Sequence, residues 1–465
     1  MKLAIAISLA LSACSTVDEN LGNTSNDPPP LSAKVFGPTR WAISLGGPLD
    51  DYSHGLALTS EGDIIVGGGI ERTAPLPLSL VSDGFITKRS VIDGSELWTV
   101  NLTPGDPEAL SAISHVAVDS DGNLVASGSF QRTVDFGGQT LTCTRQPIAS
   151  CAFLAKYDAN GALMWARGPT VSGDLDYESF ALADDGTIYV VGQAWTSIDV
   201  GDGPIAISGS AAYVVALNPS GAMSWGHAFT SSPGDSPATI AIAIAPGGDV
   251  VVTGGFLGSL HIDDQVLSSG EHQDEFIARF SSSGALRWAR VAEPSAYIDP
   301  YSVEIDANDD TLALGTDYVA GSPYQKVHVI DPVGHDLRAI ESASHGIEAR
   351  ALTLAPDGTI IVGGWIQTTT PDLGTGPLVA PSGTRIGDAA YLAAYDANGG
   401  ALDAIAFPYA APDSPQEIPW AIRPTKAGGF AFVATFAAPT DVGGITVGNA
   451  GARDVMIVML DPPSS

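Results

Sequence analysis

Short apolar runs separated by polar turns recur along the chain from residue 39 onward. The clearest runs follow an Asp-Gly or Gly-Gly turn and end near a glycine: residues 121–130 (DGNLVASGSF), 185–195 (DGTIYVVGQAW), 247–256 (GGDVVVTGGF) and 357–366 (DGTIIVGGWI). Weaker copies lie at 61–70, 309–318 and 428–436. Runs of this length that are bounded by turns predict β-strands, and no stretch of the chain has a helical period.

A second pattern follows each run and consists of an apolar strand, a turn, and a glycine four residues before a tryptophan. The pairs are Gly94 and Trp98, Gly161 and Trp165, Gly221 and Trp225, and Gly284 and Trp288. In the fifth and sixth copies the tryptophan position holds Arg338 and Asp403. The preceding turns, such as Asp158-Ala-Asn-Gly161, have an Asx side chain that caps the bend and a glycine that accepts a positive φ.

Each copy therefore predicts four short strands, which in the second copy lie at about 113–119, 123–130, 152–158 and 162–167. Taking the second turn residue of each copy as a marker gives positions 62, 122, 186, 248, 310, 358 and 429, with an average spacing of about 61 residues. Four antiparallel strands repeated seven times predict an all-β fold, a seven-bladed β-propeller.

The two ends of the repeat array are complementary. The chain from Asp461 begins a turn without the strand that follows in other copies, and residues 37–45 supply such a strand with Trp41 in the tryptophan position. We expect the N-terminal strand to close the seventh blade, which leaves no open sheet edge. An open stack of repeats, which would need a cap at each end, is the alternative.

Tryptophans at one structural position are expected to pack between neighbouring blades, since an indole buries a large area and carries a single N–H donor. The five residues are Trp41, Trp98, Trp165, Trp225 and Trp288. A continuous platform on which bases or sugars stack is the alternative interpretation.

The second copy, DGN…VASGSF…TVDFGG…FLAKYDANGALMWAR over residues 121–167, resembles the SBBP-type β-propeller repeat of secreted bacterial lipoproteins. The resemblance extends over about residues 39–460 and is weakest in the fifth copy, which lacks its insert. It implies a secreted or surface propeller of unknown ligand, and it carries over no catalytic residues.

The N-terminus predicts export. Lys2 is followed by a mainly apolar run of 11 residues, too short to span a bilayer, and Leu11-Ser-Ala-Cys14 resembles the bacterial lipobox. Residues 1–13 are therefore predicted to be a lipoprotein signal peptide, with Cys14 as the lipidation site. An ordinary signal peptide with a chance cysteine is the alternative.

Lipidation of Cys14 predicts where the protein is attached and how the segment after the cysteine is arranged. Acyl chains on Cys14 would hold the protein at a membrane surface in the bacterial cell envelope. Ser15, rather than aspartate, follows the cysteine and favours the outer membrane. Residues 14–38, with three consecutive prolines, predict a flexible tether, and residues 39–465 the propeller.

Two further cysteines remain in this oxidising compartment. Cys143 and Cys151 are eight residues apart and are predicted to form a disulfide. No cysteine and histidine cluster has zinc-ligand spacing.

The charge balance excludes one class of partner. The chain has 52 acidic and 20 basic residues, a formal net charge of −32, so nucleic-acid binding is not expected. With 45 % hydrophobic and only 15 % charged residues, the composition is nevertheless that of a folded protein.

Carboxylates recur in the loops that lead from one copy to the next. Such loops lie on one face of a propeller, so a bound Ca²⁺ is one hypothesis, with the candidate ligands Asp51, Asp174, Asp235, Asp299 and Asp413. Their spacing to the following turn varies, which favours the other interpretation, that these side chains accept backbone N–H bonds within their own turns. No other cofactor is expected.

Inserts between the second and third strands of a copy lie on the same face. They span residues 131–151, 196–210, 257–274, 367–388 and 437–452. Such loops either form a recognition surface or fold as short hairpins that widen the blade.

Motifs for nucleotide binding, serine hydrolysis or metal-dependent hydrolysis are absent from the sequence. We therefore expect a monomeric, lipid-anchored, non-enzymatic scaffold that binds a protein or glycan ligand. The alternative is an enzyme, such as a glycan lyase, a hydrolase or a quinoprotein-like dehydrogenase, that uses the carboxylate-lined face.

Overall fold

The computed structural model describes residues 34–463 except for twelve short stretches. These stretches are 73–80, 145–149, 169–174, 196, 201, 208, 232–236, 271, 293–297, 320, 379–388 and 408–418, together with the side chains of some adjacent strand residues. The predicted signal peptide, Cys14 and most of the predicted tether lie outside the described residues.

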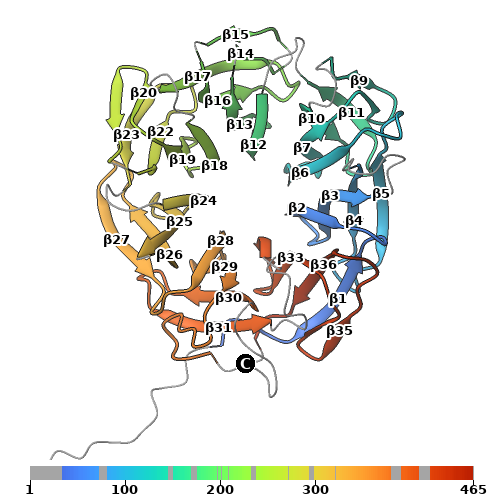
Figure 1. Ribbon diagram of the computed structural model, residues 1–465, viewed down its shortest axis with the longest axis vertical. Coiled ribbons are helices and arrows are strands. Elements are labelled where there is room, and N and C mark those ends of the chain that lie inside the picture. Colours follow the sequence, from blue (N-terminus) through green and yellow to red (C-terminus); the bar gives the residue numbers. More distant parts are fainter. Residues whose placement is uncertain are drawn as a thin grey trace, which may run out of the picture. The chain divides into compact units, whose positions relative to one another are not determined.

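The described chain forms a seven-bladed β-propeller, as predicted, in which each blade is a four-stranded antiparallel sheet (Figure 1). Blade 1 contains β2 (Asp51–Leu58), β3 (Ile64–Glu71), β4 (Ser82–Arg89) and β5 (Glu96–Leu102). Blade 2 contains β6 (Ser111–Val118), β7 (Leu124–Phe130), β10 (Cys151–Tyr157) and β11 (Leu163–Arg167). Blade 3 contains β12 (Leu175–Leu182), β13 (Ile188–Ala194), β16 (Ala211–Leu217) and β17 (Met223–Ser231).

The remaining blades continue around the ring. Blade 4 contains β18 (Ala238–Ile244), β19 (Val250–Phe256), β22 (Asp274–Phe280) and β23 (Leu286–Val291). Blade 5 contains β24 (Ile298–Ile305), β25 (Thr311–Val319), β26 (Ser322–Ile330) and β27 (Asp336–Glu341). Blade 6 contains β28 (Ile347–Leu354), β29 (Ile360–Ile366), β30 (Ala389–Tyr395) and β31 (Ala401–Phe407). Blade 7 contains β32 (Pro419–Pro424), β33 (Phe430–Phe436), β36 (Asp454–Leu460) and β1 (Thr39–Leu45).

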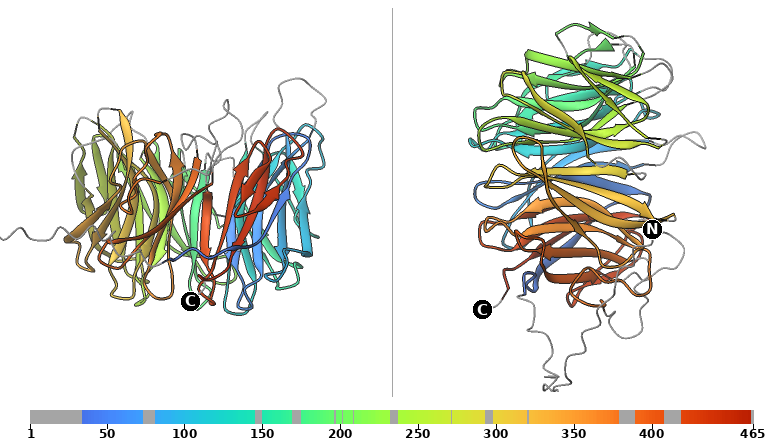
Figure 2. Two further views of the ribbon diagram at one scale, coloured as in Figure 1. Left: turned by 90° about the horizontal axis from the view of Figure 1, so that it is seen from below. Right: turned by 90° about the vertical axis from the view of Figure 1, so that its left-hand side faces the viewer.

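The ring is closed by the N-terminal strand. β1 pairs antiparallel with β36, with Trp41 opposite Met459 and Ser44 opposite Met456. The closed arrangement confirms the prediction and excludes the open stack. Seen edge-on, the strands of each blade run between the two faces of the ring (Figure 2).

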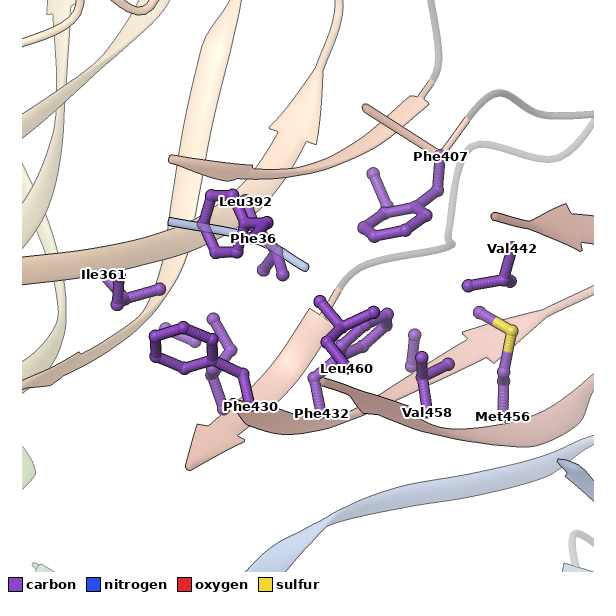
Figure 3. Close-up of a cluster of buried hydrophobic side chains, with 14 of the residues drawn as sticks. Phe36, Ile361, Leu392, Phe407, Phe430, Phe432, Val442, Met456, Val458 and Leu460 are labelled. Carbon is purple, nitrogen blue, oxygen red and sulfur yellow. The ribbon is translucent and has the colours of Figure 1, made fainter. Parts of the chain in front are cut away.

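The propeller begins earlier than the predicted boundary at residue 39. The backbone N–H groups of Val35 and Phe36 donate to Asp403 Oδ2 of β31 at 2.9 and 3.0 Å. Phe36 is buried in the core between blades 6 and 7, where it lies near Leu392, Phe430 and Leu460 (Figure 3). The side chain of Phe36 therefore holds the N-terminal segment against the ring. Residues 34–38 belong to the propeller rather than to the tether.

The repeated tryptophan position forms the seams between blades. The indole N–H of Trp41 donates to Val91 O at 3.1 Å, in the turn of blade 1, and Trp98 donates likewise to Ala159 O at 3.2 Å, in blade 2. Trp225 and Trp288 make the same bond to the next blade at 3.0 Å. Each of these indoles also packs against the glycine of that turn. Trp165 packs on Gly221 in the same manner.

The two divergent positions make the same seam with different chemistry. Arg338 donates to Ala397 O in the turn of blade 6. Asp403 binds the N-terminal segment, which replaces the turn that blade 7 does not have. The contacts place all seven residues at one structural position, and the faces of the tryptophans are used for packing rather than arranged as a stacking platform.

The inserts fold mainly as hairpins that pack on the blades. The hairpins are β8 (Thr133–Asp135) with β9 (Thr140–Thr142), β14 (Ser197–Ile198) with β15 (Ile205–Ala206), β20 (Ser259–Ile262) with β21 (Gln265–Ser268), and β34 (Thr440–Val442) with β35 (Ile445–Val447). Their first strands bury alternate side chains, for example Val134 and Phe136, or Leu260 and Ile262. β20 pairs with β17 of blade 3 and extends that sheet to six strands. The hairpins thus widen the blades, one of the two alternatives that the sequence left open.

Candidate functional site

A cavity of about 330 Å³ lies along the axis of the ring. Its lining comes from the innermost strand of all seven blades, β2, β6, β12, β18, β24, β28 and β32. These strands surround the central opening in Figure 1. A cavity of this size in a concave, pre-formed place is typical of a small-ligand site.

A β-bulge occurs at one register position in every innermost strand. The pairing with the second strand skips one residue in each blade: His54, Ser114, Glu178, Ile240, Tyr301, Arg350 and Trp420. We call these seven residues the bulge ring. A bulge leaves the extra residue unpaired and re-aims it, which is why bulges are frequent next to functional sites.

In blades 1, 2 and 6 a glycine near the end of the repeated run lies against the bulge. A Cβ on Gly68, Gly128 or Gly364 would overlap the carbonyl oxygen of Tyr52, Ala112 or Glu348 on the bulged strand. These glycines pair with the residue immediately before the skipped one. In these three blades the close approach of two backbones favours glycine, whereas Ala434 takes the equivalent place in blade 7.

Basic side chains gather on one side of the cavity. Arg350 and Arg423 come from blades 6 and 7, and His54 and His115 come from the adjacent blades 1 and 2. We call these four residues the basic arc. The lining on the other side includes Ser179, Ser302, Tyr301 and Glu304, from blades 3 and 5.

Both histidines of the basic arc are neutral at pH 7. Burial lowers the pKa of His54 to about 4. Burial, with smaller contributions from His54 and Arg423, lowers the pKa of His115 to about 3. His115 Nδ1 is buried and has no hydrogen-bond partner in the described structure. A neutral imidazole offers one donor and one acceptor, so part of the hydrogen-bonding capacity of His115 is not used by the described residues.

Arg350 is held at the edge of the cavity by neighbours on two sides. Its guanidinium lies over the Tyr301 ring, with Cζ 4.1 Å from the ring centroid, and it donates to Glu348 Oε1. Gln367 Nε2 donates to the other oxygen of Glu348 at 3.0 Å. Arg350 Nε is buried and, within the described residues, without a partner. The guanidinium is therefore oriented by protein contacts but keeps an unused donor.

Arg423 lies deeper in the cavity, near Glu304. Burial raises the pKa of Glu304 while the charge of Arg423 opposes that rise. Among the described side chains, no carboxylate forms an ion pair with Arg423. Its guanidinium donates a hydrogen bond to the backbone oxygen Ile422 O at 2.9 Å. The guanidinium charge is thus only partly compensated.

Of the five predicted metal ligands, the structure describes the side chain of Asp51 alone. The residues Asp174, Asp235 and Asp413, and the side chain of Asp299, lie outside the described part. Asp51 accepts the N–H groups of Gly47 and Glu71 at 2.5 and 2.8 Å, which is the turn-capping role. Burial, with the nearby charges of Asp454 and Glu71, raises its pKa to about 6. No group of three or more histidine, cysteine or acidic side chains suited to a metal ion is found among the described residues.

The disulfide between Cys143 and Cys151 is present in the structure. It lies at the base of the insert of blade 2, before β10, and both cysteines are buried. The described part of the chain has no helix of the length and hydropathy needed to cross a membrane.

Sequence reasoning missed the cavity residues, although a signal exists for three of them, the bulge-ring members His54, Tyr301 and Arg350. Each residue of the bulge ring precedes the positive-φ turn residue of its copy by eight positions, as His54 precedes Gly62 and Arg350 precedes Gly358. In the fifth and seventh copies that turn residue is Asp309 (φ 70°) and Gly428 (φ 86°). The turn markers at 310 and 429 in the sequence analysis lie one residue after these positive-φ residues. With those two markers, the offset from the bulge ring is not the same in every copy.

Comparison with known proteins identifies the fold but no family. No protein-family model and no curated protein sequence matches the chain. Among solved structures, the polysaccharide lyase Uly1 is 12 % identical with a TM-score of 0.51, and the alignment covers 91 % of this chain and 99 % of that one. A polysaccharide lyase of the PL25 ulvan lyase family is 8 % identical (TM-score 0.45, 90 % and 96 % covered). A protein of unknown function from Bacteroides caccae is 11 % identical (TM-score 0.33, 60 % and 78 % covered). These likenesses show a propeller and nothing more specific.

Proposed function

We propose that this protein is a lipid-anchored binding propeller of the bacterial cell envelope, with its ligand site in the central cavity. The observation that supports the site is the bulge ring. Seams, turn glycines and buried strand positions repeat from blade to blade, but the bulge ring has seven different residue types. Three of these residues, His54, Tyr301 and Arg350, line the cavity. A position that varies from blade to blade and contributes to a cavity is suited to recognition.

Binding is better supported than catalysis by the protonation states of the cavity. A general base works best with a pKa near the operating pH. The histidines of the cavity have pKa values of about 4 and 3, too low for efficient proton abstraction at pH 7. They remain effective as hydrogen-bonding groups for a protein or glycan ligand.

The envelope location rests on the sequence alone. The lipobox at Cys14 supports acylation and outer-membrane attachment of a monomer, and the likeness to SBBP-type repeats supports a secreted or surface protein. Mass spectrometry of the mature N-terminus tests acylation. Protease accessibility on intact cells tests whether the ring faces outward or toward the periplasm.

The binding proposal is tested by a panel of glycans and envelope proteins offered to the full chain in detergent. We expect a ligand whose binding is lost in Tyr301→Ala, a cavity variant, and kept in Arg287→Gln, an exposed residue of blade 4. A ligand that binds both variants equally would place the site elsewhere. If nothing in the whole panel binds to the protein, the scaffold function is contradicted.

A glycan-processing enzyme is the second candidate. It is favoured by the meeting of Tyr301, Glu304 and the basic arc in one cavity, since such groups can move protons. Turnover of a glycan that is abolished by Tyr301→Phe, while the variant stays folded, would establish the enzyme and replace the scaffold proposal.

A further inference from the structure

The sign of the charge in the cavity differs from that of the rest of the protein. The chain carries a formal net charge of −32, with 20 basic residues in total. Two of its arginines nevertheless line this one cavity. Arg350 forms an ion pair with Glu348, whereas Arg423 forms none with the described carboxylates and lies near one lining carboxyl, Glu304. Positive charge placed inside an acidic protein indicates a site for a negative group.

Unused hydrogen-bonding capacity in the cavity supports this inference. Arg350 Nε and His115 Nδ1 are buried and have no partner among the described residues. Buried polar groups in native proteins are usually hydrogen-bonded. Both atoms belong to the basic arc, so the unused hydrogen-bonding groups and the partly compensated charge of Arg423 lie on the same side.

The lining from blades 3 and 5 has a different character. Ser179 and Ser302 bring hydroxyl groups, and both are lining residues from blades 3 and 5. Hydroxyls donate and accept hydrogen bonds and complement the hydroxyls of a polyol. The cavity of about 330 Å³ has room for a molecule about the size of a monosaccharide rather than a folded partner.

We propose that the cavity binds a small polyhydroxylated carboxylate, a sugar acid or the acidic residue of a glycan. The carboxylate faces the basic arc and the hydroxyl-bearing part faces Ser179 and Ser302. Charge-assisted hydrogen bonds to guanidinium supply the affinity, because they are roughly twice as strong as neutral ones. The inference rests on the proposed binding function and assigns its ligand class.

Calorimetric titration of the full chain in detergent tests the proposal with two probes. D-glucuronate and D-glucose are similar in size and differ in the carboxylate. We expect saturable binding of glucuronate, and at least about tenfold weaker binding of glucose, since a charged hydrogen bond contributes about 1.5–3 kcal/mol. Equal binding of the two sugars, or no saturable binding of glucuronate up to about 10 mM, would overturn it.

Substitutions locate the binding. We expect Arg423→Gln to weaken glucuronate binding at least about tenfold and to leave glucose binding unchanged. Arg287→Gln, which removes an equal charge from an exposed place, should have no effect. If Arg423→Gln lowers the thermal midpoint so far that it is unfolded, Arg350→Gln takes its place with the same expectation. Glucuronate binding that survives in a folded variant of either arginine would overturn the proposal.

The outcome is separable from that of the proposed function. A neutral glycan or a protein that binds and is lost in Tyr301→Ala would leave the binding propeller intact and exclude the carboxylate. If none of the ligands binds, both the proposed binding function and the proposed carboxylate site are contradicted.

Discussion

Replacing Glu275 with glutamine should stabilise the protein increasingly as the pH rises. Glu275 lies on β22 and is completely buried. Thr253 Oγ1 donates to its Oε1 at 2.5 Å, and its Oε2 has no partner in the described part of the chain. The same register position in blade 5 holds Gln325, whose amide is bonded on both sides, to Tyr395 at 3.0 Å and Tyr391 at 2.9 Å.

The magnitude follows from the pKa. Burial raises the pKa of Glu275 from 4.5 to about 7, so the folded protein prefers the protonated form more than the unfolded chain does. Ionisation therefore opposes folding, and the penalty is absent below pH 4.5, grows through the interval up to 7 and is constant above it. At 1.36 kcal/mol per unit, (7 − 4.5) × 1.36 gives about 3 kcal/mol at pH 8.

The assay is reversible urea unfolding of wild type and Glu275→Gln at pH values between about 4 and 8. We expect the two to differ by a small constant near pH 4 and the variant to gain about 3 kcal/mol relative to wild type by pH 8. Glu61→Gln is the matched control, because Glu61 is exposed and its pKa is lowered by the Ser60 hydroxyl. A gap that stays constant with pH, or that narrows as the pH rises, would refute the raised pKa of Glu275.

Three further predictions concern the frame of the ring. Replacing Cys143 and Cys151 together by serine should lower stability by about 2–3 kcal/mol, from the closed loop of eight residues, measured by thermal unfolding with and without reductant. Trp41→Ala should cost about 3–5 kcal/mol in urea unfolding, since it removes a buried indole at the closing seam; a loss below about 1 kcal/mol would contradict that role. Gly128→Ala should cost at least about 2 kcal/mol because its Cβ would overlap Ala112 O, whereas Gly105→Ala, with open space around it, should be near neutral.

The sequence predicts the repeat architecture closely because its signals are local. Strands expected at 113–119 and 123–130 are Ser111–Val118 and Leu124–Phe130 in the structure. The closing strand was predictable as well, since a fragment with Trp41 completes the blade that the C-terminal part leaves unfinished. Phe36 was assigned to the tether because one aromatic residue in a polar segment does not reveal that a pocket between two blades receives it.

The site was less predictable, for a physical reason. Arg350, Arg423 and His115 are far apart in the sequence and meet because the innermost strands of the seven blades line one cavity. Their separate contexts carry no motif. The carboxylates of the acidic loops were the more visible pattern, but Asp51 accepts one backbone N–H from its own turn, at Gly47, and one from the end of β3, at Glu71. The constant offset of eight residues from the turn was the available signal.

The central cavity exists only if β1 closes the ring on β36, and a designed disulfide measures this closure directly. Ala42 and Val458 are paired residues of the two strands, and paired residues of antiparallel strands lie within disulfide range. In the double variant Ala42→Cys, Val458→Cys we expect a quantitative intramolecular disulfide, detected by peptide mass spectrometry of the folded protein, and none in the control Ala42→Cys, Ser283→Cys. Free thiols at positions 42 and 458 in the folded protein, or a disulfide between two molecules, would contradict the closed propeller and the ligand site within it.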